Sequence, residues 1–363
     1  MTDYIIRRSI QSVVLLFFIS LLLYVILNLV PGGPFDMLAL SNPRISKTHI
    51  DRLNMLLDLD KPILPGWYCP QFEGDTACRI DQGRYLRWLG KAFTGDWGES
   101  WTVQTGVNVL ELIFNRLGYT ILLMGISLTF AIVIAVPIGV YSAIKQYSFM
   151  DYFVTSLAFF GQSMPTFWTG LMAISILSVM LGWFPTSGVR TAGADGDIIE
   201  AIIRILSFGT KYPRLEGKEW MAIKDGLHHV ALPAMVLIYF NMAQWSRYTR
   251  ASMLEVLRQD YMRTARAKGL SEKWVILKHG LRNGLIPLIT LLALSLPGLF
   301  GGALITETIF SWPGMGRLLI DSISNVDWPI VQGVLVLSSV LVVFSNFLGD
   351  LLYAVVDPRI QYR

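Results

Sequence analysis

The stretch RQDYMRTARAKGLSEKWVILKHGLRNGLIP, residues 258–287, lies between two long apolar segments and is strongly cationic. From Arg250 to Arg282 the chain carries eight Lys and Arg residues against three acidic ones, an excess of five positive charges. Short loops with such an excess stay on the cytoplasmic side of a membrane. The stretch therefore predicts a cytoplasmic loop in a protein that crosses the membrane repeatedly.

The same stretch has the order helix, glycine, helix. Residues 262–268, MRTARAK, are rich in good helix formers. Gly269 can adopt the positive φ that ends a helix in a sharp turn. Ser271 is a typical N-cap for a second helix, with Glu272 in the first turn, where the helix dipole favours an anion. A simple connecting loop needs no such construction, so the pattern indicates a specialised element.

The composition is that of a membrane protein. Of the 363 residues, 53% are hydrophobic and 15% are charged, and the mean hydropathy is +0.51. Soluble globular chains carry about 25% charged residues. The net charge of +4 is better explained by basic cytoplasmic loops than by a nucleic-acid partner. We therefore expect the lipid bilayer, and no nucleic acid, as a partner.

Six apolar segments are long enough to cross the hydrocarbon core as helices. They are expected at about 10–30, 119–144, 152–181, 227–248, 285–305 and 330–353. The third contains Pro165, which breaks or kinks a helix because proline frees a backbone carbonyl. The first is too long for a cleaved signal peptide and is expected to be retained. The sequence thus predicts an all-α integral membrane protein with both termini in the cytoplasm.

Three parts are expected along the chain. Residues 1–30 form the first transmembrane helix, and residues 31–117 form a long extracytoplasmic loop. Residues 118–363 form a core of five transmembrane helices, which includes the cytoplasmic loop 250–283.

Both cysteines, Cys69 and Cys78, fall in the long external loop. Their spacing permits a disulfide in an oxidising compartment, and two free thiols without a role are the alternative. A metal site is not expected, because His49 is the only histidine nearby in the sequence.

The chain lacks the sequence patterns of an enzyme. ATP hydrolysis would need a phosphate-binding loop of the form GxxxxGK[ST], and Gly217-Lys218 has neither the upstream glycine nor the following hydroxyl residue. Neither a GxSxG nucleophile elbow nor an HExxH metal motif occurs. The chain is therefore expected to be non-catalytic, with its energy supplied by a partner.

Several polar side chains lie inside the predicted spans. Because polar groups in lipid are costly, they usually face a cavity or another helix. Asn241 and Gln244 are three residues apart and share a helix face. Contacts between helices are the alternative to a translocation path. The residues expected to line a path are Gln162, Ser163, Asn241, Gln244 and Ser295.

Separated motifs along the chain resemble a known family. They are PGGP at 31–34, SMPTFW at 163–168, TRASMLEVL at 249–257, TARAKG at 264–269, ETIFSWPGMGRL at 307–318 and DPRIQY at 357–362. Together they resemble the permease subunits of dipeptide/oligopeptide-type ABC importers, in which 258–283 looks like the EAA loop. Arg263, Thr264 and Ala265 stand where the general pattern has Glu-Ala-Ala, a departure common in the peptide branch.

The resemblance implies the six-helix fold of a type I ABC importer permease in the cytoplasmic (inner) membrane. It also implies a second homologous permease, two ATPase subunits that bind ATP and Mg²⁺, and an extracytoplasmic substrate-binding protein. This chain itself would bind no cofactor or metal. Residues 65–82 look like an insertion. The residues that map onto the ATPase-docking segment are Arg263, Thr264, Ala265, Arg266, Ala267, Lys268, Gly269 and Leu270.

The cargo implied by the resemblance is a di- or oligopeptide, and nickel chelates or oligosaccharides are alternatives within the same importer type. A stand-alone secondary transporter or channel is an alternative of another class. It would be expected to show ionisable groups near the bilayer midplane or inverted repeats with broken helices. A membrane-anchored scaffold or receptor would need no specialised cytoplasmic loop.

Overall fold

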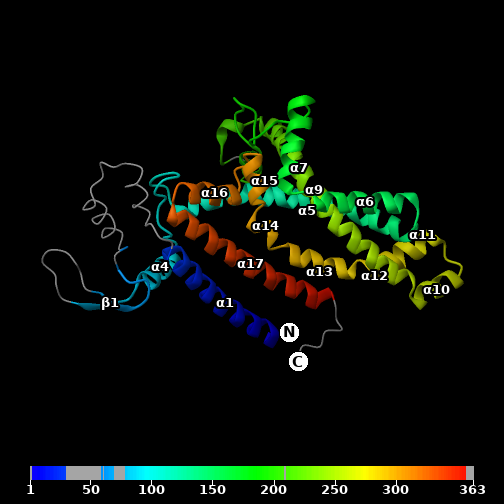
Figure 1. Cartoon of the computed structure of the whole chain (residues 1–363), viewed down its shortest axis with the longest axis horizontal. Helices are drawn as coiled ribbons and strands as arrows, with labels where there is room; N and C mark the ends of the chain where they lie inside the picture. The colour runs from blue at the N-terminus through cyan, green and yellow to red at the C-terminus, as the bar shows by residue number, and fades with distance from the viewer. Residues whose placement is uncertain (1, 30–58, 60, 69–77, 208–209, 357–363) are drawn as a thin grey trace. The chain divides into compact units, whose positions relative to one another are not determined.

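The computed structural model describes residues 2–29, 59, 61–68, 78–207 and 210–356 (Figure 1). The chain divides into two compact units. Unit 1 comprises Met1–Asn115 and Leu318–Val343, and unit 2 comprises Arg116–Arg317 and Phe344–Arg363. The predicted insertion at 65–82 is described only at 65–68 and 78–82, and Cys69 of the predicted disulfide between Cys69 and Cys78 lies outside the described residues.

The described elements are almost all helical. In the first third of the chain they are α1 (Thr2–Leu29), β1 (Gly66–Tyr68), β2 (Arg79–Asp81) and α4 (Arg84–Phe93). Then come α5 (Val109–Ile144), α6 (Phe149–Ser163), α7 (Thr166–Ala173), a π-helix (Ile174–Met180), α8 (Ile198–Leu206), a 3-10 turn (Pro213–Leu215) and α9 (Glu219–Leu257). The last elements are α10 (Asp260–Ala267), α11 (Glu272–Trp274), a π-helix (Val275–Leu281), α12 (Arg282–Gly284), α13 (Ile286–Ser295), α14 (Gly298–Gly301), α15 (Leu304–Ile309), α16 (Met315–Ser324) and α17 (Trp328–Val356).

Five described helices are long and apolar enough to cross a membrane. These spans are Ile5–Leu29, Val109–Ile144, Glu219–Leu257, Ile286–Ile309 and Trp328–Asp350. A sixth is available if the bent pair Phe149–Ser163 and Thr166–Met180 counts as one span. The predicted all-α membrane fold is confirmed. Several helices extend beyond the predicted spans, because an apolar run reports only the part in lipid, whereas polar flanks can continue the helix in water.

The break predicted at Pro165 is present. The two helices of the bent pair meet at an angle of 102°. Met164 has extended backbone angles, φ −84° and ψ 132°, which a residue before proline favours. Pro165 itself stands at the N-cap of α7 with φ −59°, so it ends one helix and opens the next.

Unit 1 is built on α1, α4 and the start of α17. Strands β1 and β2 pair antiparallel, with Trp67 opposite Ile80. The all-α prediction did not include this short hairpin, whose strands are the two β-strands among the described elements. The Tyr85 side chain of α4 is buried, and its hydroxyl lies 2.9 Å from the Ser20 hydroxyl of α1. Tyr85 also lies edge-on to Tyr24, with ring centroids 5.5 Å apart. Aromatic packing therefore joins α4 to the first span.

A buried carboxylate anchors the loop between α4 and α5. Asp327, fully buried just before α17, accepts hydrogen bonds from the Ser100 hydroxyl at 2.7 Å and the Thr102 amide at 2.8 Å. The Val103 amide also donates to it, at 3.0 Å. The pKa of Asp327 lies below its ordinary value. Burial by itself would raise this pKa, but the hydrogen bonds from Val103, Ser100 and Thr102 together outweigh burial and lower it.

In unit 2 the ETIFSWPGMGRL motif surrounds a second buried carboxylate. Glu307 of α15 is fully buried and accepts hydrogen bonds from the Thr120 hydroxyl at 2.9 Å and the Gly316 amide at 2.7 Å. A Cβ atom on Gly314 would lie 2.4 Å from the Glu307 carboxyl carbon, so only glycine fits there. The carboxylate thus joins α5, α15 and the start of α16 within the unit.

Candidate coupling loop and translocation path

The loop 250–283, hereafter the coupling loop, has the predicted order helix, glycine, helix. Helix α10 ends at Ala267, and Gly269 has φ +76°, a backbone conformation that L side chains rarely adopt. A Cβ atom on Gly269 would meet nothing within 4 Å, so the turn requires glycine for its φ and not for space. Ser271 takes the extended N-cap conformation, but its hydroxyl makes no capping hydrogen bond, contrary to the prediction.

The part of the coupling loop that follows α9, residues 258–283, packs one face against the end of α9. Met262, Ala265 and Val275 are buried and form an apolar cluster with Val256 and Leu257. Ala265, one of the residues predicted to dock an ATPase, therefore points into the loop's own core. The other seven predicted docking residues are exposed: Arg263, Thr264, Arg266, Ala267, Lys268, Gly269 and Leu270.

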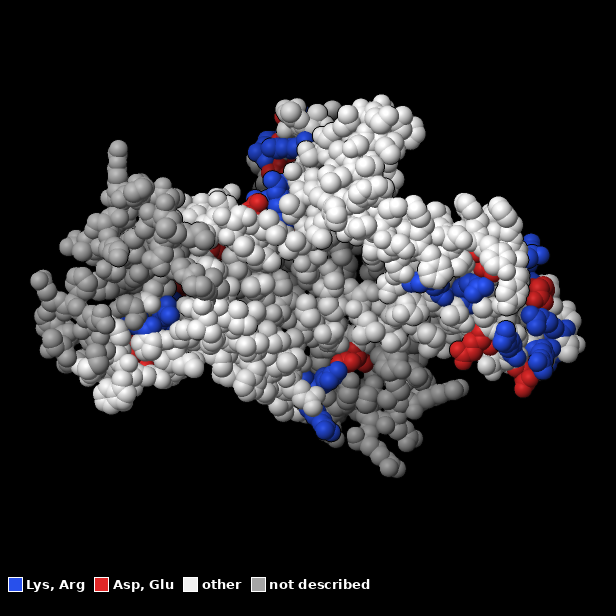
Figure 2. All heavy atoms as spheres, in the orientation of Figure 1, with Lys and Arg blue, Asp and Glu red and all other residues white. Residues whose placement is uncertain are grey.

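The exposed face of the coupling loop is rich in cations. Figure 2 shows Lys and Arg side chains gathered over the end of unit 2 where α10 and α11 lie. Arg266 forms an ion pair with Glu272 at 3.0 Å, which closes the turn around Gly269. The hydrogen bond from Arg266 holds the pKa of Glu272 below its ordinary value. Because both partners are exposed, this pair contributes little to stability.

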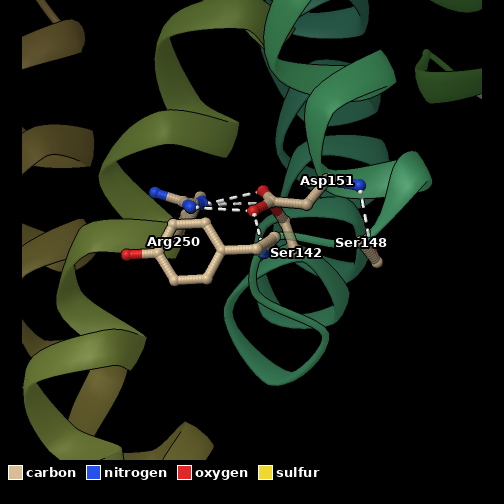
Figure 3. A network of polar contacts seen from close by, with 5 residues as sticks. Ser142, Ser148, Asp151 and Arg250 are labelled. Carbon is tan, nitrogen blue, oxygen red and sulfur yellow. Dashed lines mark hydrogen bonds and ion pairs between the residues drawn. The ribbon is translucent and has the colours of Figure 1, made fainter.

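The first residue of the coupling loop is Arg250, which still belongs to α9. Arg250 pairs with a buried carboxylate, that of Asp151 (Figure 3). Asp151, in the first turn of α6, has a side chain only 3% exposed. Its two oxygens lie 2.9 Å from Nε and Nη2 of Arg250. The Ser142 hydroxyl of α5 and the Tyr147 amide of the α5–α6 turn also donate to it. We call Ser142, Tyr147, Asp151 and Arg250 the Asp151 cluster.

Tight packing surrounds the Asp151 cluster. On α5, a Cβ atom at Gly139 would lie 2.5 Å from Cβ of Thr249 on α9, so the two helices approach closely there. Ala143 of α5 shares an apolar cluster with Met253 and Ile276. The coupling loop, the end of α9 and the α5–α6 turn are therefore packed as one body.

The sequence gives little sign of this cluster. Arg250 contributes to the cationic character of the loop, and Asp151 is one acidic residue in a short predicted turn. Nothing in the linear spacing pairs two residues that lie 99 positions apart. The one available signal is an acidic residue in the first turn of a helix, which the structure shows capped by Ser148.

The structure brings only some of the predicted path residues together. Gln162 of α6 accepts a hydrogen bond from Arg247 of α9, a residue that the sequence analysis did not single out. Gln244 is exposed one turn before Arg247. The other three donate to carbonyls of their own helices: Ser163 to Phe159, Asn241 to Leu237 and Ser295 to Leu291. Whether any of the five contacts cargo stays a prediction.

These features define a polytopic α-helical membrane protein with a cationic, glycine-bent loop packed on the end of a spanning helix. The family described as binding-protein-dependent transport system inner membrane component matches residues 135–362, and the chain belongs to this family. It is thus a multi-pass membrane permease component of such a transport system.

Full-length relatives agree with that assignment. The chain is 41% identical to the oligopeptide transport system permease protein AppB of Bacillus subtilis, with all of both chains covered. It is 37% identical to the di/tripeptide transport system permease protein DppB of Pseudomonas aeruginosa and 36% identical to the dipeptide transport system permease protein DppB of Escherichia coli. Both of these alignments also cover the whole of each chain.

Proposed function

We propose that this chain is a permease subunit of an ATP-driven importer that carries di- or oligopeptides across the cytoplasmic membrane. Three full-length relatives are named as peptide permeases, which supports peptides as the cargo class. The observation that carries the proposal is the coupling loop, which presents an exposed cationic face while its other face is packed on α9.

In this proposal the exposed face docks a cytoplasmic ATPase. Two such subunits bind ATP and Mg²⁺ and perform the hydrolysis, a second homologous permease completes the pore, and an external protein delivers the peptide. This chain is non-catalytic and binds no cofactor. The coupling loop and both termini lie in the cytoplasm, because short loops rich in Lys and Arg stay on that side.

Coupling requires that the docked loop bias two states of the permease. When the ATPases close on ATP, the loop moves with them. The Asp151 cluster and the contact between Gly139 and Thr249 join the loop to α5, α6 and α9. All three helices therefore move with the loop, and the permease exchanges an inward-facing for an outward-facing arrangement.

The test is uptake into proteoliposomes that hold the two permeases, the two ATPases and the external binding protein. Radiolabelled dipeptide, oligopeptide, nickel chelate and oligosaccharide are compared with and without ATP. We expect ATP-dependent uptake of a peptide. ATP-dependent uptake of only a nickel chelate or an oligosaccharide would replace peptide as the cargo. Uptake by the purified chain alone would favour a secondary transporter or channel and would refute the importer.

A further inference from the structure

Two arginines one turn apart on α9 have contrasting surroundings. Arg250 is paired with the buried carboxylate of Asp151. Arg247 forms no ion pair with a carboxylate among the described residues. Its guanidinium donates to the neutral Oε1 of Gln162 and lies over the Phe159 ring, 5.1 Å from the ring centroid.

A guanidinium carries five N–H donors in a planar fork that matches a carboxylate. In the described part of unit 2, Arg247 donates to the amide oxygen of Gln162, and its remaining donors have no protein acceptor there. The side chain of Arg247 is half-buried, and its contact with Gln162 is exposed. The cation is therefore accessible and able to accept an anionic group.

The position of Arg247 within α9 suggests a functional role for its charge. It follows directly on a stretch without charges from Val230 to Ser246, inside a helix that can span a membrane. Ionisable residues in spanning helices are costly and generally face other polar groups or a solute path. Gln244 is three residues from both Asn241 and Arg247, so it neighbours each of them on the surface of α9, while Asn241 and Arg247 lie about 120° apart around the helix. Two amide side chains thus precede the cation along α9.

We propose that Arg247 is a binding site for the free carboxylate of the cargo, at the end of the membrane path nearest the coupling loop. This inference rests on the proposed peptide function, since every unmodified peptide carries a C-terminal carboxylate. The guanidinium binds the carboxylate through two parallel N–H···O hydrogen bonds. Gln162 occupies one donor while cargo is absent.

The test compares a tripeptide with a free C-terminal carboxylate and the same tripeptide as its C-terminal amide. ATP-dependent uptake of both is measured in proteoliposomes with the complete complex, for wild type, Arg247→Gln and Arg190→Gln, a control at an exposed arginine outside the path. The ratio of free-acid to amide uptake is the readout. Any preference of the external binding protein enters every ratio equally and cancels between variants.

We expect wild type to prefer the free acid and Arg247→Gln to lower the ratio about tenfold, with amide uptake unchanged, because a hydrogen-bonded charge contributes about that much. Arg190→Gln keeps the cation of Arg247 and retains the preference. If Arg247→Gln slows both peptides equally, Arg247 only holds α6 to α9 or contacts lipid phosphate, and the proposal is overturned.

Two further outcomes are separable from these. If wild type takes up neither peptide but imports another solute with ATP, the proposed function fails, and this inference fails with it. If Arg247→Gln does not assemble with the ATPases, Arg247→Lys is measured in the same way. Lysine keeps the charge but loses the planar fork, so a lowered ratio supports the proposal and an unchanged ratio refutes it.

Discussion

At the scale of single residues, the two partners of the Asp151–Arg250 pair are unequally buried. The Asp151 side chain is 3% exposed and the Arg250 side chain 29% exposed. Removing Arg250 would leave a buried carboxylate without its counter-ion, which costs more than leaving a partly hydrated guanidinium. The two members of one ion pair should therefore differ when each is replaced alone.

We predict that Arg250→Ala destabilises the permease by about 3 kcal/mol and Asp151→Asn by about 1–2 kcal/mol. Thermal unfolding in detergent measures both, with Arg263→Ala as an exposed arginine control expected to change stability by less than about 0.5 kcal/mol. Asp151→Asn should also reduce peptide-stimulated ATPase activity of the assembled complex. Equal losses of stability from Arg250→Ala and Arg263→Ala would show that the Asp151–Arg250 pair does not stabilise the fold.

Asp327 predicts a pH dependence for the loop at residues 98–108. Its pKa is held below the ordinary value, so its hydrogen bonds stabilise the folded loop above the unfolded pKa of about 4. That stability is lost as the pH falls through the lowered pKa. The protection factors of the Thr102 and Val103 amides, which compare each exchange rate with that of an unprotected amide at the same pH, should therefore fall below about pH 4 in wild type. In Asp327→Asn the protection factors should be low already at neutral pH, and a protected Asn variant would contradict the assignment.

At the scale of elements, a turn can require glycine for either of two reasons: a positive φ, or a lack of room for a side chain. Gly269 allows these two reasons to be tested separately. Since a Cβ atom there meets nothing within 4 Å, substitution tests the positive φ alone. Gly269→Val should cost about 1–3 kcal/mol locally, because a β-branched residue is strained at φ +76°. Gly269→Asn should be tolerated, because Asn visits this region far more readily.

The measurement for Gly269 is peptide-stimulated ATPase activity in proteoliposomes. We expect Gly269→Val to abolish stimulation without preventing membrane insertion, and Gly269→Asn to retain most of it. If both variants fail alike, the site requires the absence of a side chain, which would mean that a docked partner approaches the backbone of the coupling loop closely. If both retain stimulation, the turn is not part of coupling.

The sequence predicts those elements whose cause is local. The turn at Gly269 and the break at Pro165 follow from backbone sterics, and the spans follow from apolar runs. Which face of α10 is buried depends on α9, so Ala265 could not be separated from its exposed neighbours. The roles of Asp151 and Glu307 depend on partners about 100 and 190 residues away, which no spacing rule connects.

At the scale of the whole molecule, the sidedness of the loops follows from the number of spans. Five of the described helices are long enough to cross, and the sixth crossing depends on the pair bent by 102° at Ser163–Thr166. If that pair crosses once, the coupling loop lies on the same side as α1's first residue. If it enters and leaves on one side, the coupling loop changes sides relative to the N-terminus. The bend therefore decides the topology on which ATPase docking depends.

Single cysteines in a background without Cys69 and Cys78 test this topology. Lys268→Cys, in the coupling loop, and Asp195→Cys, in the segment between the bent pair and α9, are both exposed positions. We expect a membrane-impermeant maleimide to label Asp195→Cys in intact cells and Lys268→Cys only in inside-out vesicles. The reverse pattern, or labelling of both from one side, would show that the coupling loop cannot meet a cytoplasmic ATPase. In that case the cationic face would need another partner.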